Sequence, residues 1–149
     1  MGFVTSPHPY PMDPYHPGLK PAPIMIVAVR HRDLEGIAFL RAFLDTGADR
    51  TILAPHSLQL LERAIGLLPA EFRYVGGRKS PFYDLGFSFD GGERWFYPEN
   101  LVEYATDRIT YPWEEDLIIG RDVLAQFEFC CNGPEESFTL KHPQYCWKH

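Results

Sequence analysis

The feature that most constrains this chain is an apolar segment, Ile37–Leu44, that runs directly into an aspartate, a threonine and a glycine. Apolar residues occupy both alternating positions of this segment, which predicts a strand buried on both faces. Asp45 would then stand at the end of that strand, at the edge of the hydrophobic core. Gly47 gives the backbone the freedom that a sharp loop requires, and an extended run resumes at Thr51–Leu53.

The segment Asp45–Asp49 reads Asp-Thr-Gly-Ala-Asp, and its Asp-Thr-Gly string occurs once in the chain. A string of three residues is a weak signal, because it arises by chance in roughly a few per cent of chains of this length. Two interpretations are therefore open from this segment alone. It is either a hairpin turn with a solvated aspartate, or a rigid loop that holds a carboxylate for chemistry.

Composition limits the class of protein. The 149 residues are enough for one domain with a hydrophobic core but short for two. The net charge of −6, with no basic stripe, argues against nucleic acid as a partner. No apolar run approaches the roughly 18 residues of a membrane span, so no membrane association is expected. The 3 cysteines lack framework spacing, which predicts reduced thiols and a cytoplasmic protein.

Residues 1–23 hold half of the 14 prolines in the chain. Proline fixes the backbone and lacks an N–H donor, so this segment is unsuited to a central strand or a helix. We expect an extended arm over 1–23, either a flexible tail or an arm that wraps the body or a partner subunit. The globular domain is expected over 24–149.

Hydrophobic periodicity over 24–149 predicts an all-β domain with two short helices. Strands are expected at 24–30, 37–44, 51–53, 72–75, 81–89 and 116–120, at 93–104 with an irregular part at Pro98, and as a closing hairpin of 127–131 with 137–141. Helices are expected at 57–66, where apolar residues recur on one face and Gly66 is a terminator, and at 121–126. The Gly76-Gly77 pair predicts a hairpin or a mobile loop.

A second motif lies about 70 residues beyond Asp45, where the apolar run of 117–119 leads into Gly120, Arg121 and Asp122. Together the two motifs resemble those of the retropepsins, the retroviral-type aspartic proteases with a single Asp-Thr-Gly, and of their cellular and bacterial relatives. The matched motifs cover 9 and 8 residues, and the order of elements fits over 24–141, outside the arm. The resemblance implies a closed all-β barrel with one or two short helices that acts as a homodimer.

The resemblance also implies roles for individual residues. Asp45 would be the catalytic aspartate, and Thr46 would join the active-site loops of two subunits. Arg121 would form a structural ion pair with Asp49. The remaining roles are support of the loop, by Thr46, Gly47 and Ala48, and substrate binding, by Gly47, Asp49, Arg50, Ile52, Gly76, Gly77 and Ile118. The segment around Gly76 and Gly77 would be the flap, and Arg50 would either favour an acidic substrate side chain or point into water.

Aspartic protease chemistry needs two carboxylates that share one proton. Since the chain has one Asp45 motif, the second carboxylate must come from another copy. One member takes a proton from water and the other donates to the scissile carbonyl, without a metal or another cofactor. The resemblance therefore implies an aspartic endopeptidase for a peptide or protein substrate, with a mildly acidic optimum. Two alternatives stay open: a catalytically silent peptide-binding module, and a protein that cleaves itself or one dedicated partner.

Other chemistries have weaker support. The 6 histidines form no pattern with zinc-ligand spacing. Cys130 and Cys131 are adjacent on an expected strand, so one is expected in the core and the other exposed. Ser57 after His56 is typical of a helix cap. None of these features competes with the Asp45 motif.

Overall fold

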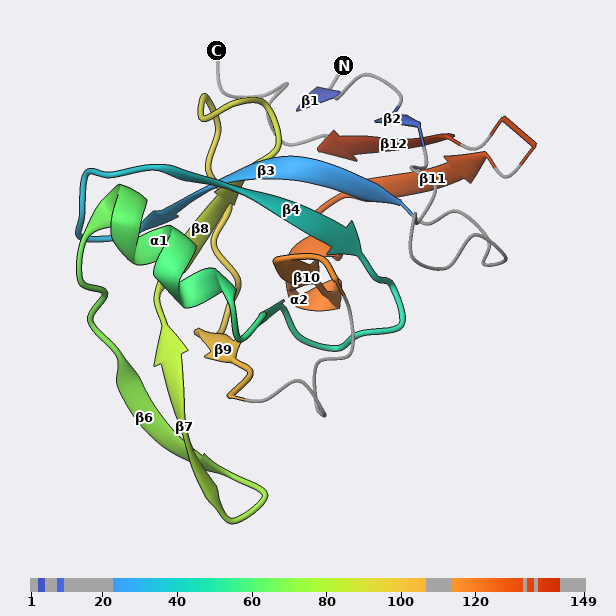
Figure 1. Cartoon of the computed structure of the whole chain (residues 1–149). Helices are drawn as coiled ribbons and strands as arrows, with labels where there is room; N and C mark the ends of the chain where they lie inside the picture. Colours follow the sequence, from blue (N-terminus) through green and yellow to red (C-terminus); the bar gives the residue numbers. More distant parts are fainter. Residues whose placement is uncertain are drawn as a thin grey trace.

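The computed structural model describes residues 3–4, 8–9, 23–106, 114–132, 134–135 and 137–142. Within them the chain forms a large sheet, a small sheet and two helices (Figure 1). The strands of the large sheet are β3 (Ile24–His31), β4 (Ala38–Leu44), β5 (Ile52–Leu53), β6 (Glu71–Val75), β7 (Arg78–Tyr83), β8 (Leu85–Ser88), β9 (Val102–Tyr104) and β10 (Leu117–Ile119). Those of the small sheet are β1 (Phe3–Val4), β2 (His8–Pro9), β11 (Glu128–Asn132) and β12 (Ser137–His142). The helices are α1 (Ser57–Ile65) and α2 (Arg121–Leu124).

The large sheet is open. Its eight strands run in the order β6-β7-β9-β5-β10-β4-β3-β8, and among the described residues no ladder joins β6 to β8. The predicted closed barrel is therefore wrong, although the prediction of a mostly β chain with two short helices is confirmed. The physical reason is that β6 finds its hydrogen-bond partner in β7 alone, and the β6–β7 hairpin extends away from the body (Figure 1).

β3 and β4 pair antiparallel and are buried on one face. On β4, Leu40 and Leu44 are buried at 1% exposure, whereas Phe39 is 62% exposed. Ile26 on β3 is also exposed. The prediction that 37–44 is buried on both faces is therefore wrong, because no described element covers the outer face of these strands at Phe39 and Ile26.

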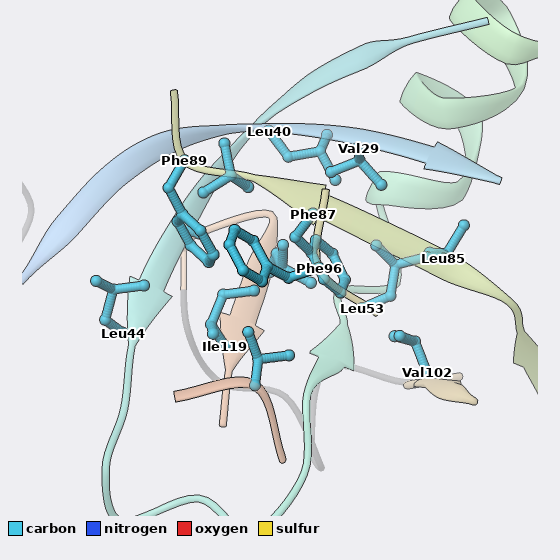
Figure 2. Close-up of a cluster of buried hydrophobic side chains, with 14 of the residues drawn as sticks. Val29, Leu40, Leu44, Leu53, Leu85, Phe87, Phe89, Phe96, Val102 and Ile119 are labelled. Atoms are coloured by element: carbon cyan, nitrogen blue, oxygen red, sulfur yellow. The ribbon is translucent and has the colours of Figure 1, made fainter. Parts of the chain in front are cut away.

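The core lies under the inner face of the large sheet (Figure 2). Leu40, Phe87 and Ile119 meet there from three different strands, each with at most 1% exposure. From the small sheet, β12 adds Phe138 and Leu140 at alternate positions. Burial of one such side chain contributes about 1.5–3 kcal/mol, so this cluster is what holds the two sheets together.

Most predicted elements are confirmed within one or two residues, including α1, which ends at Gly66 with φ of 104°. The strand predicted at 93–104 is confirmed only at its end, since β9 forms at Val102–Tyr104 and Phe96 makes a single bridge to Phe87. The Asp90 carboxylate accepts the backbone N–H groups of Glu93 and Arg94 at 3.1 and 3.0 Å. Those donors are thereby used in a turn and cannot serve a sheet. Neither helix of the described chain has the length and apolarity to cross a membrane.

Two pieces of the proline-rich segment lie on the small sheet. β1 and β2 both pair antiparallel with β12, at edge positions that tolerate a proline. The division into an arm and a domain remains a prediction.

On β11 both Cys130 and Cys131 are exposed, so the prediction of one core cysteine is wrong. β12, not β11, supplies the buried side chains Phe138 and Leu140 of this sheet, while Cys146 lies outside the described residues.

Candidate active site

The pairing of β4 with β10 brings the two sequence motifs together. These strands run parallel, with Leu44 opposite Ile119, and parallel strands end at the same edge of a sheet. Asp45 and Gly120 therefore follow their strands side by side. The backbone N–H of Asp45 donates to the carbonyl of Ile119 at 2.9 Å, which fixes the start of the loop.

The strands on either side of the Asp45 loop do not pair with each other. β10 lies between β4 and β5, with Ile118 opposite Phe43 on one side and Ile52 on the other. The loop must therefore cross the end of β10 to reach β5. The interpretation of Asp45 as the tip of a simple hairpin is wrong, because a hairpin would place β4 and β5 next to each other.

The Asp45 side chain is half-buried and oriented by its own loop. Its Oδ1 accepts the backbone N–H of Gly47 at 2.9 Å, and its carbonyl accepts the N–H of Ala48 at 3.2 Å. A Cβ at Gly47 would lie 3.1 Å from Oδ1, so the glycine permits this close approach. Within the described chain no hydrogen bond reaches Oδ2, which leaves that oxygen available to a ligand or a second copy.

Asp49 and Arg121 come together beside this loop. Their side chains form an ion pair, and the backbone N–H of Arg121 donates to the carbonyl of Ala48 at 2.8 Å. The two side chains are 80% and 58% exposed, and an exposed pair contributes about 0–1 kcal/mol. The contact therefore orients the loop more than it stabilises the fold.

Sequence reasoning missed a buried contact behind the loop. Thr51 is 1% exposed, and its hydroxyl and N–H donate to the two carboxylate oxygens of Asp122 at 2.7 and 3.0 Å. The same hydroxyl accepts the N–H of Gly120 at 3.1 Å. The available signal was a threonine at the head of an apolar run, 71 residues from an aspartate in the first turn of α2.

Gly120 also allows the backbone of Arg50 to approach closely, a role that its place in the motif did not reveal. A Cβ built on it would lie 2.5 Å from the carbonyl oxygen of Arg50 and 2.9 Å from its nitrogen. Real side chains do not approach backbone so closely, and backbone atoms cannot rotate away. Only glycine lets the loop that follows Asp45 pass over the end of β10.

The predicted flap residues Gly76 and Gly77 form the turn of the β6–β7 hairpin. Their φ values of 59° and 80° suit a two-residue turn that matches the twist of the strands. Of the hollows that border the hairpin, two include predicted substrate-binding residues, and neither of these two is lined by Asp45 or by the two glycines. One, of about 220 Å³, includes Ile52, and the other, of about 230 Å³, includes Arg50.

The remaining predicted residues are Ile118 and Thr46. Ile118 is 4% exposed and packs in a small apolar cluster with Ala54 and Ala105, below the surface and outside both hollows. Thr46 is exposed, and its hydroxyl has no hydrogen-bond partner in the part of the chain that the structure describes. It is free to contact a second molecule.

Ser57 and His56 form neither a side-chain helix cap nor a catalytic pair. His56 occupies the cap position of α1 without a side-chain cap bond, so the predicted Ser57 cap is wrong. The Ser57 hydroxyl donates to the carbonyl of Asp116 at 2.6 Å, and Nε2 of His56 lies 2.8 Å from the Asp116 carboxylate. These contacts tie the start of α1 to Asp116, the residue that precedes β10. Among the described residues no cluster of histidine, cysteine and carboxylate side chains could hold a metal ion.

Tyr104 lines the hollow that includes Ile52. Its hydroxyl donates to the carbonyl of Pro55 at 2.8 Å. Burial raises the pKa of Tyr104, with a smaller contribution from the charge of Glu62. The phenol is therefore held neutral as a hydrogen-bond donor at the wall of the hollow.

No protein-family model matches the chain, and no curated protein matches it. Solved structures similar to it include EIAV protease complexed with the inhibitor HBY-793, at 21% identity over 72% of this chain and 89% of that one, with a TM-score of 0.47. A retropepsin-like aspartic protease from Rickettsia conorii is 15% identical over 81% and 94%, with a TM-score of 0.48. The retroviral protease-like domain of Ddi1 from Leishmania major is 18% identical over 80% and 92%, with a TM-score of 0.45. These structural neighbours are of the retropepsin-like type that the two sequence motifs resemble.

Proposed function

We propose that this chain is an aspartic endopeptidase whose active site is completed by a homodimer. The observation that carries the proposal is the setting of Asp45. Its backbone is bonded to Ile119, its carboxylate is oriented by Gly47, and its side chain is only half-buried at the edge of the sheet. The sequence holds one Asp-Thr-Gly motif, so two Asp45 carboxylates, one from each subunit, would form the dyad.

The chemistry follows from the repulsion between two like charges. Two adjacent carboxylates cannot both ionise easily, so the dyad keeps one proton over an intermediate pH range. The ionised carboxylate takes a proton from a water molecule, whose oxygen attacks the scissile carbonyl carbon. The protonated carboxylate donates its proton to the carbonyl oxygen. Collapse of the tetrahedral intermediate then breaks the C–N bond, and a proton passes to the leaving amine.

The surroundings of Asp45 would bind the substrate as an extended strand. In this proposal Gly47 and Asp49 bond the peptide backbone, and the hollow at Ile52 accepts a side chain. Ile118 supports the floor of that hollow. The β6–β7 hairpin, turning at 76–77, would close over the peptide as a flap.

The exposed hydroxyl of Thr46 is suited to join the loop of one subunit to that of the other. The exposed free thiols of Cys130 and Cys131 support a reducing compartment, the cytoplasm. In this setting the protein would act on peptide or protein substrates as a homodimer.

The direct test compares the wild type with Asp45→Asn on a peptide library from about pH 3 to pH 7. The amide oxygen can still accept the Gly47 N–H, so we expect the variant to fold and to lose cleavage by about three orders of magnitude or more. Asp33→Asn, a change at an exposed carboxylate outside the site, should cleave as the wild type does. Equal cleavage by the wild type and Asp45→Asn would refute the proposal.

A peptide-binding module without catalysis is the second candidate. It is favoured by the exposure of Phe72 and Tyr74 on the hairpin, at 58% and 78%. Exposed aromatic side chains can bind a peptide through apolar contacts, which require no catalytic residue. Absence of cleavage by the wild type across the pH range, together with binding of library peptides, would establish it.

Self-cleavage is the third possibility, and mass spectrometry of the purified chain tests it. A chain that cleaves itself would be found truncated, and the Asp45→Asn variant would be found intact.

A further inference from the structure

The hollow of about 230 Å³ is lined by residues of the β6–β7 hairpin, by Arg50 from the loop that leads from Asp45 to β5, and by Asn100 and Leu101 from the segment before β9. Its walls carry two arginines from different elements, Arg50 from the loop and Arg73 from β6. Apolar side chains that include Val75 and Phe82 complete the wall. A hollow with two guanidinium groups is notable in a chain whose net charge is −6.

Of the two arginines of this hollow, Arg73 has a carboxylate partner, and Arg50 has none among the described residues. Arg50 is exposed and forms no ion pair with any residue in the described ranges. Arg73 contacts the carboxylate of Glu71 at 3.2 Å and lies over the Phe82 ring at 5.5 Å. Glu71 is 58% exposed and the Arg73 side chain 44%, so this pair is weak and a bound carboxylate can compete with it. Glu71 does not line this hollow, but it lines an adjoining one that shares Phe82 and Leu101 with it.

A second hollow along the hairpin has a related charge pattern. The hollow at Ile52 is lined by Arg78 and Lys79, with Glu103 as its carboxylate. The two hollows together therefore present four cationic side chains and one anionic side chain along the hairpin. A peptide that reaches these two hollows would therefore meet an excess of cationic side chains, whereas a third hollow along the hairpin is lined by the carboxylates of Asp33, Glu71 and Asp84.

The geometry suits a carboxylate in particular. Guanidinium groups bind carboxylates through paired N–H donors, and such charge-assisted bonds are about twice as strong as neutral ones. The apolar wall of Val75 and Phe82 lowers the local dielectric constant and strengthens the attraction. The volume of about 230 Å³ has room for one long side chain.

We propose that this hollow is a specificity subsite for the side chain of Asp or Glu in a bound peptide, with Arg50 as the main selecting residue and Arg73 as its partner. The inference rests on the proposed function in one respect, that the peptide lies beneath the hairpin. It assigns a substrate class, acidic peptides, to that site. Arg50 and Arg73 act here through substrate binding and not through the reacting atoms.

The test uses fluorescein-labelled octapeptide pools in which one position at a time is fixed as Glu, Gln or Lys and the others are randomised. Binding is measured by anisotropy on Asp45→Asn, and cleavage is measured on the chain with Asp45 intact. We expect Glu to be preferred over Gln by about tenfold at one position. The preference should shrink as salt concentration rises.

Variants then assign the preference to residues. Arg50→Gln should reduce it to about twofold, Arg73→Gln should reduce it less, and Arg50→Glu should shift it toward Lys. Arg63→Gln is the matched control, since Arg63 is an exposed arginine in the last turn of α1. It should keep the preference of the wild type.

The binding measurement and the cleavage measurement together distinguish the acidic subsite from the endopeptidase activity. Selective binding of Glu without any cleavage supports the subsite and refutes the endopeptidase. Cleavage without a Glu preference at any position supports the endopeptidase and overturns the subsite. The subsite is also overturned if Glu pools show no measurable binding, or if Arg50→Gln and Arg63→Gln have the same preference.

Discussion

Thr51 and Asp122 are joined by two hydrogen bonds, from the threonine hydroxyl at 2.7 Å and from its backbone N–H at 3.0 Å. The pair ties the end of the Asp45 loop to the first turn of α2. Thr51 is buried, whereas the neighbouring pair of Asp49 and Arg121 is exposed. Since a buried donor without a partner is costly, the Thr51–Asp122 contact is the part of the site that most strongly fixes the loop.

Replacing Asp122 with alanine should lower the free energy of unfolding by about 2–4 kcal/mol, because two bonds to a charged acceptor are lost and the Thr51 N–H is left unpaired. Asp122→Asn should lower it less, since the amide oxygen can still accept one of the two bonds. Urea unfolding measures both changes. Glu99→Ala, at an exposed acidic residue, should stay within about 0.5 kcal/mol of the wild type. Equal stability of Asp122→Ala and Glu99→Ala would contradict the assignment.

A methyl group at Gly120 should displace the loop. The Cβ of Gly120→Ala would lie 2.5 Å from the Arg50 carbonyl oxygen, so either the strand end or the loop must move. We expect a loss of about 1–3 kcal/mol in stability, typical of overpacking, and a larger fractional loss of cleavage because Asp45 belongs to the same loop. The two effects are read from urea unfolding and from kcat/KM. Unchanged stability and unchanged kcat/KM would show that the approach of Arg50 does not constrain the site.

The sequence predicts the elements of this chain well where one physical signal dominates. The spacing of Leu58, Leu61 and Ile65 predicts α1, and Leu61 is buried as expected. The predictions fail where contacts with residues outside a segment determine its conformation or its burial. The Asp90 carboxylate accepts the N–H groups of 93 and 94 and prevents a strand. Phe39 is exposed because nothing described covers the outer face of β4.

The candidate site was predictable as two motifs but not as an arrangement. Asp45 and Arg121 stand in recognisable strings, and their proximity follows once β4 and β10 run parallel. The position of β10 between β4 and β5 depends on pairing across more than 60 residues, which no local pattern encodes. The Thr51–Asp122 contact and the backbone approach at Gly120 depend on the same crossing. They could not be inferred before the topology was known.

Stability should fall at alkaline pH through Tyr83 and Tyr104. Burial is the main cause that raises the pKa of each phenol above its usual value of 10.0. The folded chain therefore holds both phenols neutral, and the unfolded chain ionises them first. Their contribution to stability is fully present below pH 10 and is lost as the pH rises through the raised pKa values.

Urea unfolding from pH 7 to pH 11 measures this loss. The double variant Tyr83→Phe, Tyr104→Phe should lose less stability above pH 10 than the wild type. At pH 7 it should be less stable by about 1 kcal/mol, because the bond from Tyr104 to the Pro55 carbonyl is gone. Tyr74→Phe, at a side chain with 78% exposure, is the control and should follow the wild type. Identical alkaline slopes for all three proteins would contradict the assignment.

The central claim is that two Asp45 side chains, one from each chain, perform the reaction, and subunit mixing tests it most directly. The wild type and Asp45→Asn are mixed in equal amounts, allowed to exchange, and assayed at a fixed total concentration. If both carboxylates of a dimer are required, only dimers of two wild-type chains cleave. The activity then falls to about one quarter of that of the wild type alone at the same total concentration. If each chain cleaves alone, activity falls only to about one half, and that result would contradict the shared dyad.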